Sequence, residues 1–250
     1  MKRINFRSAI VAGALAIANI PGTGVALAAD SHNPEEVRNI KVARVFTPKG
    51  LDSNDNSVVV LDGYLPDGCY RITKPEVQVN DATKTISFQA RANYFNVPCI
   101  EALVPFTQEV ELGMLSPGHY RIQSKEGREM GALLVAKAES KYPDDFLYAP
   151  VEVLLLDQKE TNPGEQMATL RGRFTNSCMF LDHVATKYFP DSIEILPVMG
   201  MRKGDCAQVE VPFAIDVALD ANRLTEGRML VHARSLNGRW VSAMLNVMSY

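Results

Sequence analysis

Leu61-Asp62-Gly63-Tyr64-Leu65-Pro66-Asp67-Gly68-Cys69 is repeated 109 residues later as Leu170-Arg171-Gly172-Arg173-Phe174-Thr175-Asn176-Ser177-Cys178. Two further matches follow in the same order. Cys99 and the Val-Pro-Phe triplet at 104–106 correspond to Cys206 and the triplet at 211–213, and the turn at 115–118 corresponds to that at 224–227. One framework written twice predicts two domains of the same fold.

The first 28 residues have the features of a signal peptide. Positive charges at Lys2, Arg3 and Arg7 precede an apolar stretch at 8–20, and Ala26-Leu27-Ala28 gives a small-x-small cleavage pattern. The apolar stretch is too short to cross the roughly 30 Å hydrocarbon core, so a membrane anchor is disfavoured. We expect an exported protein, periplasmic or extracellular, with no membrane span in the mature chain.

The charge balance bears on the kind of partner. The formal net charge is −3, and it becomes −6 without the first 28 residues, which carry three cations and no acid. A nucleic-acid partner requires a concentrated basic face, which a mildly acidic chain lacks. We therefore expect no nucleic-acid partner.

The four cysteines are shared equally between the two copies. In an exported chain such cysteines favour disulfides over metal binding. Because a repeated unit should carry its own bridge, the duplication predicts Cys69–Cys99 and Cys178–Cys206. Each bridge closes a loop of about 30 residues, which is worth roughly 3–4 kcal/mol in the chain-entropy model.

Each copy reads as seven short strands separated by turn signals, with almost no helical pattern. In the first copy the strands are expected at 40–46, 57–65, 70–79, 85–92, 104–112, 119–124 and 130–136. In the second copy they are expected at 151–156, 166–174, 179–187, 192–198, 208–219, 228–235 and 239–247. Pro75 suggests that its strand is an edge strand or contains a bulge. The fold class is therefore all-β, with two tandem seven-stranded sandwiches and one disulfide in each.

The turn Leu115-Ser116-Pro117-Gly118-His119-Tyr120 resembles the Leu-x-Pro-Gly-x-x-Tyr corner of fibronectin type III and related immunoglobulin-like domains. The spacing to the tyrosine departs by one residue, and Met229 stands at the corresponding place of the second copy. The resemblance implies immunoglobulin-like sandwiches, a class that most often serves in binding, adhesion or structure.

The predicted organisation is a signal peptide (1–28), an N-terminal tail (29–39), one sandwich (40–138), a linker (139–149) and a second sandwich (150–250). The linker is charged and aromatic and lacks the glycine and serine of a flexible tether. We expect Tyr142, Phe146 and Tyr148 to pack between the domains and fix the elbow.

A search for catalytic and metal-binding motifs finds few candidates. The metalloprotease, serine-hydrolase and phosphate-loop patterns do not occur. A distributed site that joins His183 to Asp182 is an open but disfavoured alternative. Asp52, Asn54 and Asn56 alternate in the manner of calcium ligands, although a polar turn is the preferred interpretation. No cofactor is expected.

The best binding candidates are the aromatic residues near the first disulfide, Tyr64, Tyr70, Tyr94 and Phe95. Tyrosines on sandwich loops bring a large rigid contact area with a polar tip. The alternative is that these rings cover the disulfide. We expect a non-enzymatic binding or structural protein whose partner is a protein or a cell-surface polymer. A carbohydrate-binding module or small-ligand carrier is the alternative function, and an enzyme with an unrecognised site is a less favoured one.

Overall fold

The computed structural model describes residues 36–142, 144, 146–158 and 166–247. The predicted signal peptide and most of the predicted N-terminal tail lie outside these residues. Contacts group Pro34–Tyr250 into one compact unit. In its described part no helix is both long and apolar enough to cross a membrane.

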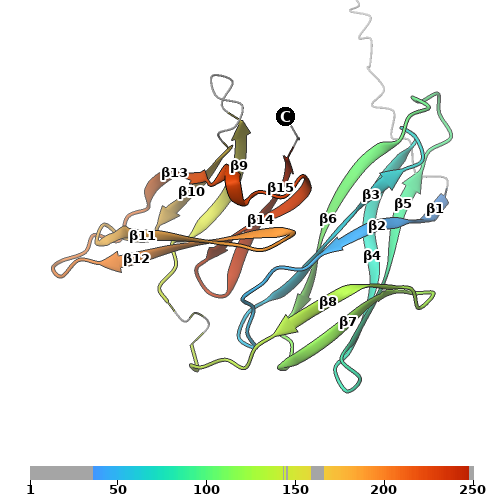
Figure 1. Cartoon of the computed structure of the whole chain (residues 1–250). Helices are drawn as coiled ribbons and strands as arrows, with labels where there is room; N and C mark the ends of the chain where they lie inside the picture. Colours follow the sequence, from blue (N-terminus) through green and yellow to red (C-terminus); the bar gives the residue numbers. More distant parts are fainter. Residues whose placement is uncertain (1–35, 143, 145, 159–165, 248–250) are drawn as a thin grey trace, which may run out of the picture. The chain divides into compact units, whose positions relative to one another are not determined.

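The first strand set forms a sandwich of two sheets (Figure 1). Its strands are β1 (Glu36–Ile40), β2 (Val42–Phe46), β3 (Ser57–Leu65), β4 (Tyr70–Asn80), β5 (Thr85–Tyr94), β6 (Val104–Gly113), β7 (Gly118–Ser124) and β8 (Glu129–Val135). One sheet has the order β2-β3-β6. In the other, β5 pairs with β4, β1 and β7, and β8 follows β7. We call β1–β8 the first sandwich.

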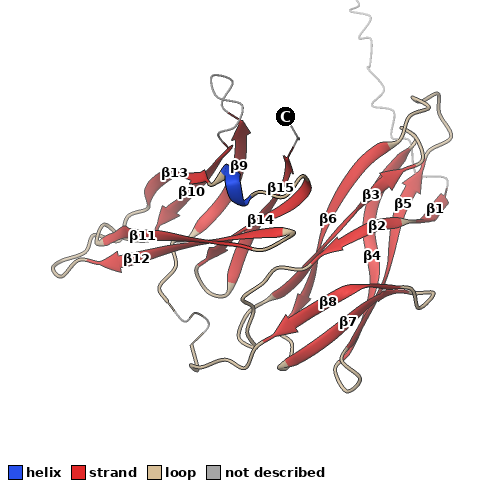
Figure 2. Ribbon diagram, viewed as in Figure 1, coloured by secondary structure: helices blue, strands red, loops and turns tan. Residues whose placement is uncertain are grey.

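The second strand set, β9–β15, repeats this arrangement and is called the second sandwich. Its strands are β9 (Val151–Gln158), β10 (Gln166–Phe174), β11 (Met179–Tyr188), β12 (Ser192–Met201), β13 (Val211–Leu219), β14 (Gly227–Ser235) and β15 (Arg239–Val247). The sheets have the orders β13-β10-β9 and β11-β12-β14-β15. A short 3-10 helix at Ala221–Arg223 precedes β14 (Figure 2).

The two sandwiches share one topology, as the duplication predicts. If β1 and β2 are counted as one strand of the repeat, the fourth strand is β5 in the first sandwich and β12 in the second. In both sandwiches this strand is antiparallel to the third strand (β4 or β11) and parallel to the sixth strand (β7 or β14). Immunoglobulin constant domains instead place the fourth strand beside the fifth. The all-β sandwich prediction is confirmed, and the strand order differs from that of immunoglobulin constant domains.

The strand expected at 40–46 is two strands. Residues 36–40 pair with β5, and after Lys41 the chain crosses to the other sheet, where β2 pairs with β3. Residues 36–39, assigned to a tail, therefore belong to the sheet. The second sandwich repeats the crossing, because Leu147 and Ala149 bond to β12 before β9 pairs with β10. Pairing to a distant strand, which no local pattern reports, decides this split.

Each sandwich has its own core between its sheets. Leu61, Ile86 and Tyr120 are fully buried in the first core, and Leu170, Ile195 and Met229 in the second. These side chains come from the inward row of their strands, as the alternation of a half-buried strand requires. Each core is closed at one end by a disulfide.

Both predicted disulfides are present, Cys69–Cys99 and Cys178–Cys206, with Cα atoms 5.5 and 5.4 Å apart. The prediction for Pro75 is also confirmed. Its strand, β4, lies at a sheet edge, and the register shifts between Thr73 and Glu76. An edge position tolerates proline because the missing N–H removes no ladder bond from a central strand.

The two sandwiches contact each other through the outer faces of β3 and β14. Phe46 and Val60 of the first sandwich and Leu230 of the second form one buried cluster. At its margin Arg228 pairs with Asp62 at 3.0 Å. The contact therefore combines an apolar centre with an ion pair at its margin.

The linker is only partly as predicted. Tyr148 is buried, and the Arg234 guanidinium lies 5.2 Å from its ring centroid. The prediction that Tyr142 and Phe146 also pack between the domains is wrong, because both are exposed. Hydrogen bonds hold the start of the linker: the Asn54 side-chain amide donates to the carbonyl oxygens of Ser140 and Tyr142.

Candidate functional site

The disulfide pole of the first sandwich is the end that carries Cys69–Cys99. Tyr70 opens β4, Tyr94 closes β5, and the two residues are directly paired. Their ring centroids are 5.2 Å apart. Tyr70 is buried and Tyr94 half-buried. Both rings therefore contribute to the end of the core.

Arg38 of β1 holds these two rings in place. Its guanidinium lies 3.8 Å from the Tyr94 ring centroid and donates to the Tyr70 hydroxyl at 2.9 Å. Hydrogen bonds to Glu36 and then to Tyr70 raise the pKa of Arg38. Phe95 is half-buried, and its N–H donates to the Cys69 carbonyl. Among the four aromatic candidates, only Tyr64 presents an exposed ring.

Two aliphatic residues that the aromatic search missed are exposed at the same pole. Ile100 is 76% and Leu103 68% exposed, beside Tyr64 at 50%. The Gly68 N–H donates to the Ile100 carbonyl, which fixes the loop after Cys99 against the start of β4. We call Tyr64, Ile100 and Leu103 the apolar pole. Exposed apolar side chains that form one patch mark an interaction surface more often than scattered ones do.

The second sandwich provides an internal comparison for the apolar pole. Its corresponding loop is built alike, with the Ser177 N–H donating to the Ala207 carbonyl at 3.0 Å. Arg173, Ala207 and Glu210 stand where the first sandwich has Tyr64, Ile100 and Leu103. Arg173 pairs with Glu210 at 3.5 Å and with Glu152 at 3.0 Å. The scaffold therefore accepts a charged pole, so the fold alone does not require an apolar one.

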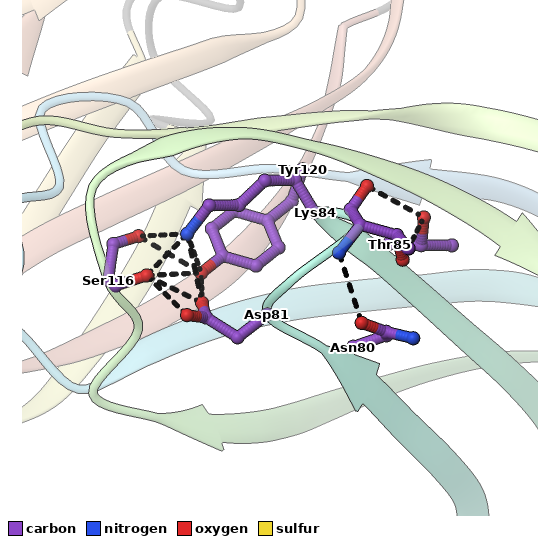
Figure 3. A network of polar contacts seen from close by, with 7 residues as sticks. Asn80, Asp81, Lys84, Thr85, Ser116 and Tyr120 are labelled. Carbon is purple, nitrogen blue, oxygen red and sulfur yellow. Dashed lines mark hydrogen bonds and ion pairs between the residues drawn. The ribbon is translucent and has the colours of Figure 1, made fainter.

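A polar cluster lies at the corner between β6 and β7 (Figure 3). Tyr120 rises from β7 toward Asp81 and Lys84 in the β4–β5 turn. Its hydroxyl has two acceptors in reach, an Asp81 carboxylate oxygen and the Ser116 carbonyl oxygen at 3.0 Å. The Ser116 hydroxyl donates to Asp81 at 2.6 Å, and Lys84 pairs with Asp81 at 3.0 Å.

This cluster brings a serine, a lysine and a tyrosine together, a combination that also occurs in nucleophilic sites. Hydrogen bonds from Ser116, Tyr120 and Lys84 lower the pKa of Asp81, which makes it a weak base. Burial acts to lower the pKa of Lys84, but bonds to Tyr120 and Asp81 outweigh it and raise the pKa. A protonated lysine cannot activate Ser116 as a nucleophile. The cluster therefore serves as a tyrosine corner that locks one turn onto another.

The calcium candidates form a turn and a contact. Asp52 accepts from the Asn54 N–H at 2.7 Å, and Asp55 accepts from the Asp52 N–H at 2.8 Å. The Asn54 amide is bonded to linker carbonyls, as described above. Among the described residues the one metal-like grouping is Asp67 with Cys69 and Cys99, whose sulfurs form the disulfide.

The disfavoured catalytic pair is an exposed neighbour contact. His183 Nδ1 lies 2.9 Å from a carboxylate oxygen of Asp182, and both side chains are more than half exposed. A register shift at this point of β11 places the two side chains together. The edge strand holds the pair in solvent, outside any enclosed site.

A cavity of about 370 Å³ opens between the sandwiches. Its wall is apolar at Val60, Leu230 and Met244, and Thr107 and Glu109 supply polar groups. This volume lies within the range of small-molecule sites, roughly 300–1,000 Å³. Sequence reasoning gave no indication of it, because its walls come from strands far apart in the chain.

The family model of the ORF11 β-sandwich domain matches residues 59–130. The match runs from β3 into β8 and includes the first disulfide and the tyrosine corner. No curated protein and no solved structure matches the chain. The first sandwich is thus similar to a β-sandwich family.

Proposed function

We propose that this chain is an exported, non-enzymatic binding protein of tandem immunoglobulin-like sandwiches, which contacts a partner protein through the apolar pole of the first sandwich. Export is supported by the leader features of residues 1–28 and by one disulfide in each sandwich. The immunoglobulin-like character is supported by the two-sheet sandwich and the tyrosine corner, whereas the strand order differs from that of immunoglobulin constant domains.

The observation that carries the proposal is the difference between equivalent poles. Tyr64, Ile100 and Leu103 occupy positions where the same scaffold carries Arg173, Ala207 and Glu210. Covering the exposed leucine and isoleucine side chains by a partner would be favourable, because each Å² of apolar surface removed from water contributes about 25 cal/mol. Two of the three side chains are aliphatic and offer no π-face for stacking on a sugar, which favours a protein over a polysaccharide.

The test uses one pole as the control for the other. A photo-crosslinking amino acid is placed at Ile100 in one variant and at Ala207 in another, and both are produced in the native cell. We expect a specific adduct at position 100 and none at 207. Equal labelling at the two positions, or labelling at neither, contradicts the proposal.

A second variant replaces the apolar pole by its counterpart: Tyr64→Arg, Ile100→Ala and Leu103→Glu together. Exposed substitutions change the unfolding free energy by about 0.5 kcal/mol or less each, so the melting temperature should change little. We expect the adduct formed by a crosslinker at the neighbouring exposed position 102 to disappear. A full adduct from this variant would rule out the apolar pole as the contact surface.

The cavity beside Val60 and Leu230 supports one second candidate, a carrier of a small apolar ligand. Such a ligand should raise the melting temperature of the parent chain more than that of Val60→Trp, because the indole ring would fill the cavity. An absence of stabilisation by any apolar compound in the parent chain would exclude the carrier.

A further inference from the structure

The outer row of β14 is buried beneath the first sandwich. Met229, Val231 and Ala233 face the core of the second sandwich. Because side chains alternate along a strand, Leu230, His232 and Arg234 face the other way. They are nevertheless buried, and Leu230 contacts Phe46 and Val60 of the first sandwich.

Arg234 binds the first sandwich by a buried ion pair. Its guanidinium lies 2.6 Å from a carboxylate oxygen of Asp55, and the two side chains are 3% and 0% exposed. Asp144 of the linker is 4.0 Å from Arg234 and accepts from the N–H groups of Asn237 and Gly238. The β2–β3 loop, the linker and the β14–β15 turn therefore meet at the Arg234 guanidinium.

His232 lies between Leu230 and Arg234 in this row. Its Nδ1 is 3.2 Å from the Ser242 hydroxyl, and its ring centroid is 4.2 Å from that of Trp240. Its Nε2 is buried and has no hydrogen-bond partner among the described residues. Trp240 in turn packs against the core of the first sandwich. An imidazolium at this place would be a second cation beside Arg234 with no acceptor for its Nε2 proton.

The charged groups around His232 come from several elements. They are Arg234 on β14, Glu194 at the paired position of β12, Lys187 on β11 (3.3 Å from Glu194), Asp55 in the β2–β3 loop and Asp144 in the linker. From β15 the facing groups, Trp240 and Ser242, carry no charge. Asp55 and Asp144 face Arg234, and Glu194 is paired with Lys187, so none of these carboxylates is free to neutralise a new cation.

We propose that the contact between the two sandwiches is an acid-sensitive latch, which opens when His232 takes up a proton beside Arg234 and leaves both sandwiches folded. The buried polar atoms of the contact favour this event. Buried side-chain atoms without a hydrogen bond occur at eight of the described residues, and five of these lie at or beside the contact, where opening would hydrate them: Asp55, Asp62, Arg228, His232 and Arg234.

The direction of the pH effect follows from linkage. Burial, and then the charge of Arg234, lowers the pKa of His232 from 6.5 to about 3 in the closed form. In the open form the imidazole is in water and titrates near 6.5. The open form therefore binds the extra proton, and the closed form loses stability as the pH falls below about 6.5. The open-to-closed ratio should rise by up to about tenfold for each pH unit below that value.

Two carboxyl groups act in the opposite direction. Burial raises the pKa of Asp55 and of Asp62 despite their arginine partners. The closed form therefore takes up these protons more readily than the open form and gains stability as the carboxyls titrate. We expect His232 to dominate, because it titrates at higher pH in the open form than a carboxyl does.

The experiment uses the mature full chain and its one tryptophan, Trp240. Fluorescence, small-angle scattering and far-UV circular dichroism are recorded from about pH 8 to about pH 4, across the range in which a solvated histidine titrates. We expect the Trp240 emission to shift to the red and the radius of gyration to increase, while the β-sheet signal is unchanged. A flat emission and radius across this range would overturn the latch. Emission changing only together with loss of the β-sheet signal would mean unfolding and would overturn it too.

The matched variants are His232→Gln and His119→Gln. Glutamine is chosen because Gln123 of β7 stands at the position that corresponds to His232. His119 is an exposed histidine on β7, the strand that corresponds to β14. We expect His232→Gln to remove the transition and His119→Gln to retain it. An unchanged midpoint in His232→Gln would contradict the proposal, and the parent-chain titration tests it even if that variant does not fold.

Discussion

β7 and β14 are the same strand of the repeat, yet one is buried on a single face and the other on both. In β7 the inward residues Tyr120 and Ile122 are buried, whereas His119 and Arg121 are exposed. In β14 nearly every residue is buried. The difference lies mainly in the outer row, where Leu230 replaces Arg121.

This comparison shows how a duplicated sandwich acquires a partner surface without a change of fold. The inner row is constrained by the core in both copies. The outer row is free to diverge, and in β14 it has become the face that contacts the first sandwich. The last position of the row changes in kind: Lys125 pairs with Glu76 in solvent, whereas its counterpart Arg234 pairs with Asp55 in a buried contact.

The largest expected effect separates these two ion pairs. Asp55→Ala leaves the Arg234 guanidinium buried without its nearest counter-ion, which should cost about 3–5 kcal/mol. Glu76→Ala breaks the exposed pairs with Lys125 and Arg91 and should cost far less, because solvent screens them. Chemical denaturation of the two variants measures both values. Similar losses in the two would show that the contact at Arg234 is not buried in solution.

The disulfides should show where the copies are alike. Cys69→Ser with Cys99→Ser, and Cys178→Ser with Cys206→Ser, each remove a bridge over a separation of 30 or 28 residues. Each double variant should lose about 3–4 kcal/mol in the chain-entropy model. Denaturation measures the loss, and non-reducing peptide mapping of the parent should give these two bridges alone. A bridge between the copies would contradict the duplication.

A truncation in the outer row tests the burial of β14 directly. Leu230→Ala should cost about 2–3 kcal/mol, because it removes buried methyl groups from the contact with Phe46 and Val60. Arg121→Ala at the matching place of β7 should change the unfolding free energy by less than about 0.5 kcal/mol. Thermal denaturation at one pH compares them. Equal effects would remove the distinction between the two strands.

The smallest effect concerns the corners. Tyr120→Phe removes a hydroxyl that bonds Asp81 and Ser116 and should cost about 1 kcal/mol. The second sandwich has Met229 there, and Tyr188 reaches its corner from β11, accepting from the Asp220 N–H at 2.7 Å. Tyr188→Phe removes this acceptor from the Asp220 N–H and should cost a similar amount. No loss in either variant would show that the corners contribute shape rather than hydrogen bonding.

The amino-acid sequence by itself determined the features that are local or written twice. The repeat gave both disulfides, because each copy has to close its own loop. Alternation placed the strands, with Pro75 at an edge, and the Leu-Ser-Pro-Gly turn indicated the corner of Tyr120. Of the four aromatic binding candidates, only Tyr64 is exposed, since a ring at a strand end packs on whatever neighbour the fold supplies.

Only the tertiary structure decided the rest. The parallel pairing of β5 with β7, the crossing at Lys41 and the contact of β3 with β14 each join residues far apart in the chain. Alternation reports that a face is apolar, as at Leu230, but not which surface covers it. Exposure of Ile100 and Leu103 likewise depends on the absence of a neighbour above them in the fold. Such outcomes depend on complementary surfaces meeting in space, for which a single strand carries only half of the information.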